Sequence, residues 1–143
     1  MTDYVPDYGI DEWRAWETPC GFLLCTDELA VSVTDQFVSQ MLALGNECAG
    51  AGYARWVAVN PSRVVNTTLH RVEYYLDTGS PPDFGTPAAG LPIKWMVGFL
   101  DTGDDATATI IGYWDLGGVD PDGTAFTVDV GADGLVHIAY QAP

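Results

Sequence analysis

The chain has 143 residues, and its hydrophobic content of 48% is enough for one packed core, since single domains usually contain roughly 100–200 residues. Five basic residues against twenty acidic ones give a formal net charge of −15. A surface this acidic repels phosphate backbones and anionic membranes, which argues against a nucleic-acid or membrane partner. The longest apolar runs, such as 22–25 and 96–100, are too short to span a bilayer.

The start of the chain and its cysteines indicate the kind of cellular compartment in which the protein is made. The first residues, MTDYVPDYGIDEW, contain neither the basic nor the apolar region of an export signal. Cys20, Cys25 and Cys48 are an odd set without the CxxC spacing of a zinc site. We therefore expect free buried thiols, synthesis in a reducing compartment, and no cofactor.

Residues 1–19 are acidic and aromatic and follow neither helical nor strand periodicity. We interpret them as an extended N-terminal arm, followed by a single domain over residues 20–143. A disordered tail and an arm that packs against a neighbour both stay open, and large aromatic side chains contribute most when they are buried. The four aromatic residues that carry this argument are Tyr4, Tyr8, Trp13 and Trp16.

The first part of the domain predicts one strand and one helix. Residues 21–26 read GFLLCT, a run typical of a buried strand. Thr34 is a suitable N-cap for a short helix, and Gly45 with Asn46 ends it. The apolar residues on one side of this helix are Phe37, Val38, Met41 and Leu42.

After the helix, the pattern changes to a period of two. Residues 55–60 and 63–76 are rich in β-branched and aromatic residues, and the Asn-Pro-Ser turn at 60–62 between them suggests a hairpin. The segment 79–90 contains three of the nine prolines and predicts a long loop.

The last third predicts two further hairpins. Residues 93–101 and 107–116 form strands around the turn at 102–106, and 124–130 pairs with 135–140 through the Gly-Ala-Asp-Gly turn between them. The whole chain is therefore expected to be mainly β, as an antiparallel β-sandwich or jelly-roll-like barrel with one short helix.

Asp-Thr-Gly occurs twice, at Asp77 and at Asp101, and Ile-Ile-Gly follows the second copy at 110–112. Aspartic proteases need two such carboxylates about 3 Å apart on separate loops. The two triplets are too close in sequence for two lobes, and the Ile-Ile-Gly segment lies on the return strand of the same hairpin. We interpret the triplets as turns, in which Asp accepts local amide hydrogen bonds and Gly takes a positive φ.

Three other chemistries stay open as minor alternatives. Asp101, Asp104 and Asp105 could bind calcium, as could the Asp-Pro-Asp-Gly stretch at 120–123, although neither matches an EF-hand loop. His70 and His137 stand alone in strand patterns without a nucleophile beside them. Tryptophans would favour a sugar platform only on one exposed face, and the strand residues Trp56, Trp95 and Trp114 are expected in the core or a subunit contact.

Five motifs in order resemble a family of small tailed-bacteriophage virion proteins. Members of that family look like a short "Phe-Val" helix, a "Glu-x-Ser-Gly-x-Gly-Tyr" segment, an "Arg-Val-Glu-Phe" strand, an "Asp-Thr-Gly-Asp" turn and an "Ile-Gly-Tyr" strand. This chain departs from them in its acidic arm and at Cys48 and Ala49. The matching motifs here are TDQFVSQ at 34–40, NECAGAGYAR at 46–55, RVEY at 71–74, VGFLDTGDD at 97–105 and IIGY at 110–113.

The resemblance implies a structural component of the particle, described for the family as head decoration, head fibre or minor tail protein, with no catalytic residues. Because a capsid lining faces DNA, the charge favours the outer surface of the head. We expect a non-enzymatic capsid decoration protein, assembled in the host cytoplasm as a homotrimer on the major capsid protein. A minor tail or tail-tip protein and a glycan-binding spike module are the alternatives.

Two elements are expected to contact the partner. The first is the aromatic arm over residues 1–19, and the second is the loop over residues 79–91, in which long connections often carry function. The loop residues nominated for this contact are Pro82, Phe84 and Pro87.

Overall fold

The computed structural model describes residues 19–58, 62–68, 71–76, 81–129 and 136–139. In this part the chain is mainly β, with antiparallel sheets and one short helix, as predicted. The sheets are not closed, which favours the sandwich over the barrel. Residues 1–18, His70 and Asp77, for which the sequence also gave predictions, lie outside the described residues.

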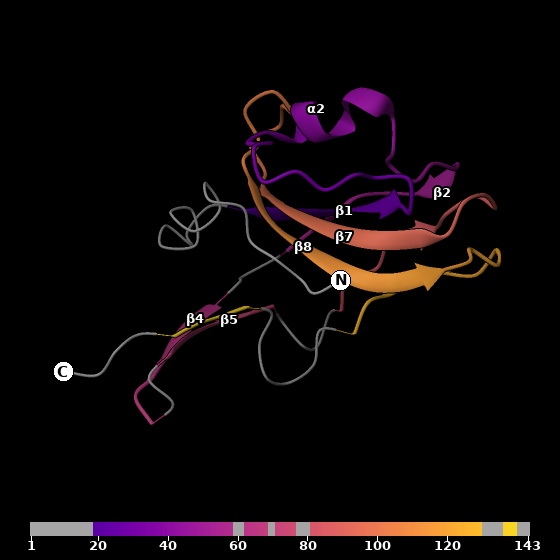
Figure 1. Cartoon of the computed structure of the whole chain (residues 1–143). Helices are drawn as coiled ribbons and strands as arrows, with labels where there is room; N and C mark the ends of the chain where they lie inside the picture. Colours follow the sequence, from indigo (N-terminus) through magenta and orange to yellow (C-terminus); the bar gives the residue numbers. More distant parts are fainter. Residues whose placement is uncertain (1–18, 59–61, 69–70, 77–80, 130–135, 140–143) are drawn as a thin grey trace.

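A four-stranded sheet forms the centre of the molecule (Figure 1). Its strands are β1 (Cys20–Thr26), β3 (Trp56–Val57), β7 (Ile93–Leu100) and β8 (Ile110–Val119), in the order β3-β1-β7-β8. All three pairings are antiparallel. The predicted strand at 21–26 and the predicted hairpin of 93–101 with 107–116 are therefore confirmed, with the second strand shifted by three residues.

Both faces of this sheet are buried, which explains why β1 and β7 read as nearly continuous apolar runs. On one face, Leu23, Trp95 and Tyr113 pack in a cluster with the helix. On the other, Phe22, Met96 and Trp114 pack with Phe84, Leu76 and Ala58. The sheet is therefore the middle layer of the body.

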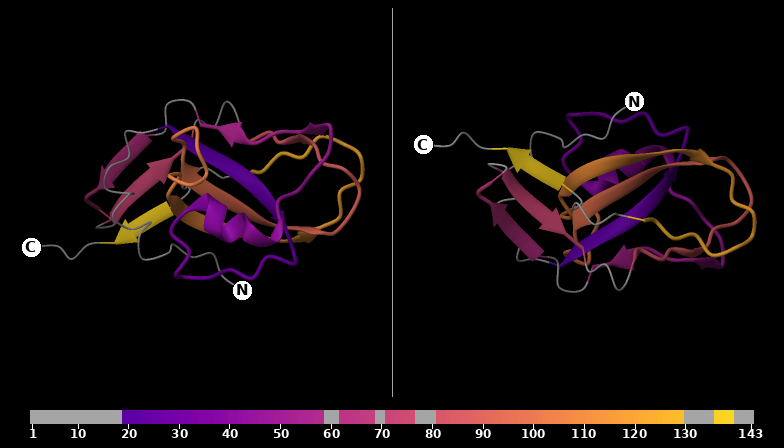
Figure 2. Two further views of the ribbon diagram at one scale, coloured as in Figure 1. Left: turned by 90° about the horizontal axis from the view of Figure 1, so that it is seen from above. Right: turned by 90° about the horizontal axis from the view of Figure 1, so that it is seen from below.

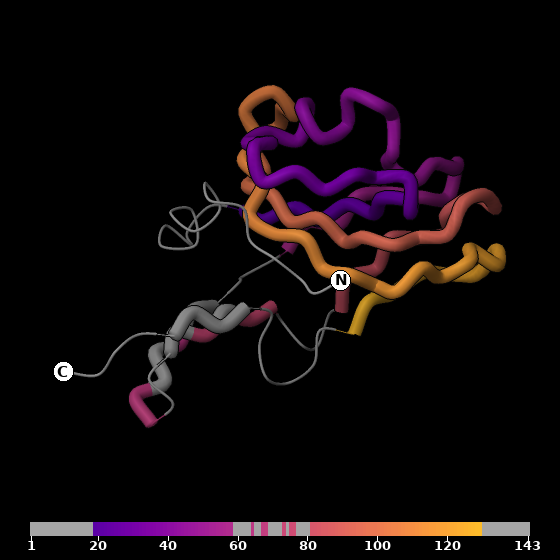
Figure 3. The backbone as a smooth tube through the Cα atoms, in the orientation of Figure 1, coloured from indigo at the N-terminus to yellow at the C-terminus, as the bar shows by residue number. Residues whose placement is uncertain are grey.

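The short helix α2 (Val38–Met41) continues as the 3₁₀ turn η1 (Leu42–Leu44) and lies on one side of the central sheet (Figures 1 and 3). Gly45 ends it with φ +72°, as predicted. The predicted N-cap at Thr34 is wrong, because Phe37 stays extended and bridges Thr109 before the helix begins. None of the helices in the described part of the chain has the length and apolar character needed to cross a membrane.

The hairpin predicted between 55–60 and 63–76 is wrong. Residues 56–57 pair with β1 instead, where the rings of Trp56 and Phe22 lie 5.7 Å apart. The second segment folds back on itself as β4 (Ser62–Asn66) and β5 (Arg71–Tyr75). Burial of Trp56 against the central sheet outweighs the local turn at 60–62.

The hairpin predicted between 124–130 and 135–140 is also wrong. Strand β9 (Val136–Ala139) pairs with β5, which gives a three-stranded sheet β4-β5-β9 beside one end of the central sheet (Figures 1 and 2). Thr127 instead bridges Asp83. The gain is apolar burial, because Phe126 and Val128 pack against the core that contains Phe84.

Candidate functional site

An ion-pair cluster connects three distant parts of the chain. The Arg55 guanidinium donates from Nε and Nη2 to the two Glu47 carboxylate oxygens, each at 2.7 Å. It also donates from Nη1 and Nη2 to Asp105, at 2.6 and 2.9 Å. Both carboxylates are thus bound by two parallel hydrogen bonds, the geometry that makes arginine pairs strong and directional.

Two further groups complete this cluster. The Tyr53 hydroxyl donates to Glu47 at 3.0 Å and accepts the Leu24 amide of β1 at 3.0 Å. The Arg55 guanidinium lies 5.6 Å from the centre of the Phe99 ring, within cation–π range. Burial raises the pKa of Tyr53, so the phenol stays a hydrogen-bond donor to the carboxylate.

The electrostatics of the cluster favour its charged form. The hydrogen bonds that Arg55 donates to Glu47 and Asp105 raise the pKa of Arg55, and those donated to Asp105 lower the pKa of Asp105. The three side chains are still 22–38% exposed. With every carboxylate oxygen already accepting a hydrogen bond, the arrangement is suited to holding segments together, not to transferring protons.

The sequence patterns did not predict this cluster, although two of the five motifs contain its residues. Glu47, Tyr53 and Arg55 belong to the segment NECAGAGYAR, and Asp105 ends the segment VGFLDTGDD. The available signal was the rarity of basic residues, since an arginine in so acidic a chain attracts a carboxylate partner. The sequence does not show which of the twenty acidic residues would be the partner of Arg55.

The second Asp-Thr-Gly forms the predicted turn. The Asp101 carboxylate accepts the Gly103 amide at 3.0 Å, and Gly103 has φ +83°. The Ile-Ile-Gly motif has a packing role, because a side chain at Gly112 would overlap the Trp114 ring.

The candidate calcium ligands point to different partners. Asp101 accepts an amide of its own turn, Asp104 accepts the Ala106 amide at 2.9 Å, and Asp105 binds Arg55. In the second candidate, the Asp122 carboxylate accepts from Thr124. Within the residues that the structure describes, no group of three Cys, His, Asp or Glu side chains gathers at a metal-like site.

The three tryptophans in the described part of the chain do not gather on one exposed face. Trp95 is 1% exposed on the helix-covered face of the central sheet, and Trp114 is 9% exposed on the opposite face. Trp56 is half-buried against the same core as Trp114. These three residues therefore occupy the core, as the strand positions predict.

The nominated partner contacts fall in two places. Tyr4, Tyr8, Trp13 and Trp16 lie outside the described residues. Pro82, Phe84 and Pro87 are buried, with Phe84 at 0% exposure in the core. Part of their loop also forms strand β6 (Gly85–Thr86), which pairs with β2 (Gly52–Tyr53). The exposed residues in the described part of the loop are instead Pro81, Asp83 and 88–91.

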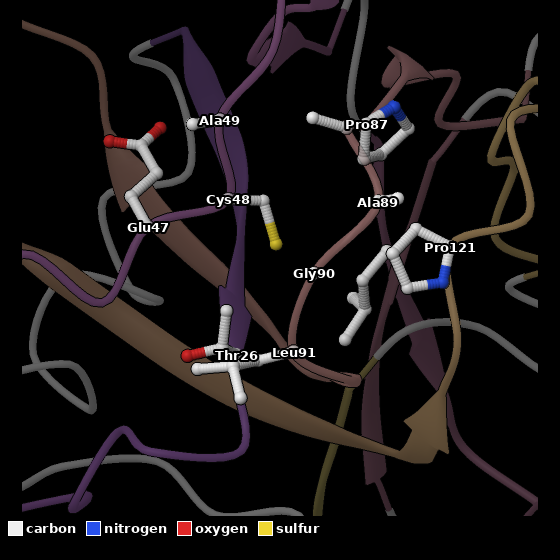
Figure 4. A pocket seen from close by; sticks show the side chains of 11 residues that line it. Thr26, Glu47, Cys48, Ala49, Pro87, Ala89, Gly90, Leu91 and Pro121 are labelled. Carbon is white, nitrogen blue, oxygen red and sulfur yellow. The ribbon is translucent and has the colours of Figure 1, made fainter.

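A small apolar pocket of about 190 Å³ lies between this loop and the segment 47–49 (Figure 4). Pro87, Ala88 and Leu91 line it on one side, Cys48 and Ala49 on the other, and Pro121 lies at its edge. Leu91 is 45% exposed. The sequence patterns did not predict this pocket, because its walls meet through pairing of segments far apart in the chain: β2 with β6, and the Ala88 amide with the Ala49 carbonyl at 2.8 Å.

The three cysteines are free and buried, as predicted. Burial raises the pKa of the Cys20 thiol to about 12 and that of Cys48 to about 11. The pKa of Cys25 is also raised by burial and, to a smaller extent, by Glu47. Because the thiolate is the reactive form, none of the three is suited to nucleophilic chemistry.

Comparison of the chain with protein-family models, with curated proteins and with solved structures finds no match in any of the three.

Proposed function

We propose that this chain is a structural protein of a tailed-bacteriophage particle, a capsid decoration protein that binds the major capsid protein on the outside of the head. It acts by adhering to a repeated protein lattice and catalyses no reaction. In this proposal it is made in the host cytoplasm, assembles as a homotrimer, and contacts the lattice through its arm and the loop over residues 79–91.

The observation that carries the proposal is the ion-pair cluster of Glu47, Arg55 and Asp105. These residues come from two of the motifs in which the chain resembles virion structural proteins. Their side chains bind one another, so the motifs have a role in holding the fold together. In this cluster every carboxylate oxygen already accepts a hydrogen bond from the chain itself, which supports a structural role for these two motifs over a role in binding a substrate.

Charge supports the outer surface of the head. A net charge of −15 would repel packaged DNA from a lining protein. The same charge keeps an outward-facing protein soluble at the high local concentration of a lattice.

In this proposal the protein stabilises the capsid shell because its binding is thermodynamically linked to lattice assembly. A protein that binds only the expanded, assembled lattice shifts the equilibrium toward the intact shell, by an amount that grows with its concentration relative to Kd. Because many copies act together, a modest affinity per site is sufficient.

The test is binding to expanded heads that lack decoration. The purified chain should cosediment with them to saturation at hundreds of copies per head, and quantitative mass spectrometry of complete particles should give the same number. A handful of copies per particle would instead indicate the minor tail protein. Absence from finished particles, or turnover of a substrate by the purified chain, would contradict the proposal.

The glycan-binding alternative is less favoured. It requires aromatic rings gathered on one exposed face, and Trp95 and Trp114 lie buried on opposite faces of the central sheet. Isothermal titration against host cell-wall glycans is expected to give no heat of binding.

A further inference from the structure

We propose that the pocket between Cys48 and Leu91 is a docking site for one aliphatic or aromatic side chain on a basic segment of a partner protein. The pocket is lined mainly by proline, alanine and leucine side chains, and its residues come from four places far apart in the sequence: Thr26, 47–49, 87–93 and Pro121. In Figure 4 the Glu47 carboxylate is directed away from it, and the Cys48 thiol into it. Its interior is therefore apolar, although it opens at an acidic surface.

Size restricts the occupant to a single side chain. Cavities that hold drug-sized ligands have about 300–1,000 Å³, whereas an apolar cavity of about 150 Å³ holds one benzene ring. The volume of about 190 Å³ here matches a leucine or phenylalanine side chain. The half-exposed Leu91 extends the apolar contact to the rim.

Charge determines what flanks that side chain. Asp27 follows the lining residue Thr26, and its amide is bonded to the Pro92 carbonyl at 3.0 Å, next to Leu91. Asp120 and Asp122 flank the lining residue Pro121, and all three aspartates are exposed. Of the basic residues with described side chains, Arg55 and Lys94 are each already paired with carboxylates. The rim is therefore acidic and complements lysine or arginine.

The same charge argues against occupants from this chain. A second copy carries a net charge of −15, and the segment 1–18 contains five acidic residues and one arginine. Either would bring negative charge to a negative rim, which costs binding energy. A foreign segment with lysine or arginine beside its apolar residue fits both features.

This inference stands on the pocket itself, and it rests on the proposed function only for assigning the segment to the capsid partner. The probes are therefore short peptides: acetyl-Arg-Leu-Arg-amide, acetyl-Arg-Ser-Arg-amide and acetyl-Glu-Leu-Glu-amide. Each is titrated into the full ¹⁵N-labelled chain while its amide resonances are followed.

The first peptide is expected to shift the resonances of residues 48–49, 88–91 and 122 with saturation. The other two should bind at least about tenfold more weakly, and about 1 M salt should weaken the first. Leu91→Ser should reduce its affinity several-fold, whereas Leu44→Ser, the same change at a leucine that is 85% exposed on η1, should not. Asp27→Asn with Asp120→Asn should reduce the effect of salt.

Equal binding of the Arg-Leu-Arg and Arg-Ser-Arg peptides, or shifts spread over the surface, would overturn the docking site. The outcome separates the two proposals. Binding of heads without peptide binding would reject the pocket alone, and peptide binding without head binding would reject the decoration role alone.

Discussion

Arg55 is the residue on which the described ion-pair cluster depends. It supplies both hydrogen bonds to Glu47 and both to Asp105. Arg55→Met would leave Glu47, only 22% exposed, without its cation. We expect a loss of about 2 kcal/mol in the free energy of unfolding in urea, less than for a fully buried pair because the cluster is partly hydrated.

Lys94→Met is the matched control for that measurement. Lys94 approaches Asp115 at 3.6 Å, beyond hydrogen-bond length, and Asp115 also accepts the Gly117 amide at 2.9 Å. This substitution is expected to cost less than about 1 kcal/mol. Equal losses in the two variants would show that Arg55 has no special structural role.

The pH dependence of stability should include Asp105. Because Arg55 lowers the pKa of this carboxyl in the folded state, the unfolded chain binds the proton more readily. The stabilisation is therefore present above the unfolded pKa, near 4, and is lost as the pH falls through the folded pKa. The difference in unfolding free energy between the natural chain and Asp105→Asn should shrink from about pH 6 to about pH 3, and a constant difference would contradict the assignment.

The cysteines give a test of the core. Since Cys20, Cys25 and Cys48 are buried and their pKa values are raised, the folded chain should react with a thiol-specific disulfide reagent at about pH 8 far more slowly than a free thiol. Unfolding in guanidinium chloride should expose all three. If one thiol per folded chain reacted as fast as a free thiol, that cysteine would have to lie at the surface.

At the scale of elements, the short pairing of β2 with β6 holds the loop over residues 79–91 to the body. Gly85 has φ +69°, and a Cβ there would overlap the Gly52 carbonyl oxygen. Gly85→Ala should cost about 3 kcal/mol in urea unfolding, from the left-handed backbone and the clash together. Gly123→Ala has a similar φ of +83° in open space and should cost only about 1 kcal/mol. Equal losses of unfolding free energy in Gly85→Ala and Gly123→Ala would mean that the close β2–β6 pairing at Gly85 does not contribute to stability.

Sequence patterns predicted the elements that are defined by their own residues. The apolar run at 21–26 can only be a buried strand, and the strands around the turn at 102–106 are neighbours in sequence and in space. The predicted strand pairings were wrong where pairing with a more distant segment buries more apolar surface than pairing with the nearer one. Strand β3, which contains Trp56, pairs with β1, and the segment around Phe126 pairs with residues 82–85. In both cases a strand nearer in the sequence was the predicted partner.

The candidate site shows the same limit. The Asp101 turn follows from three adjacent residues and was predicted. The pairing of Arg55 with Asp105 spans 50 positions, and the pocket joins Cys48 to Leu91 across the loop. Such contacts depend on register between segments, which local periodicity does not encode.

At the scale of the whole molecule, charge and shape make different contributions to the proposed role. The net charge of −15 argues against contact with DNA. Because both faces of the central sheet are buried, the proposed recognition of a lattice is assigned to loops and to the arm. That division makes the arm and the pocket separable in experiments, because one is rich in aromatic residues and the other receives an apolar side chain.

Removal of residues 1–18 tests the arm. The truncation keeps Pro19, whose carbonyl accepts the Asp101 amide at 2.8 Å. We expect the body to stay folded, because the described members of the clusters on both faces of the central sheet, Cys20 onward, are kept. Binding to undecorated expanded heads should be lost, since the aromatic anchors are gone. The full-length variant Trp13→Ala with Trp16→Ala separates the anchors from chain length, and undiminished cosedimentation of both variants would refute the arm as a contact.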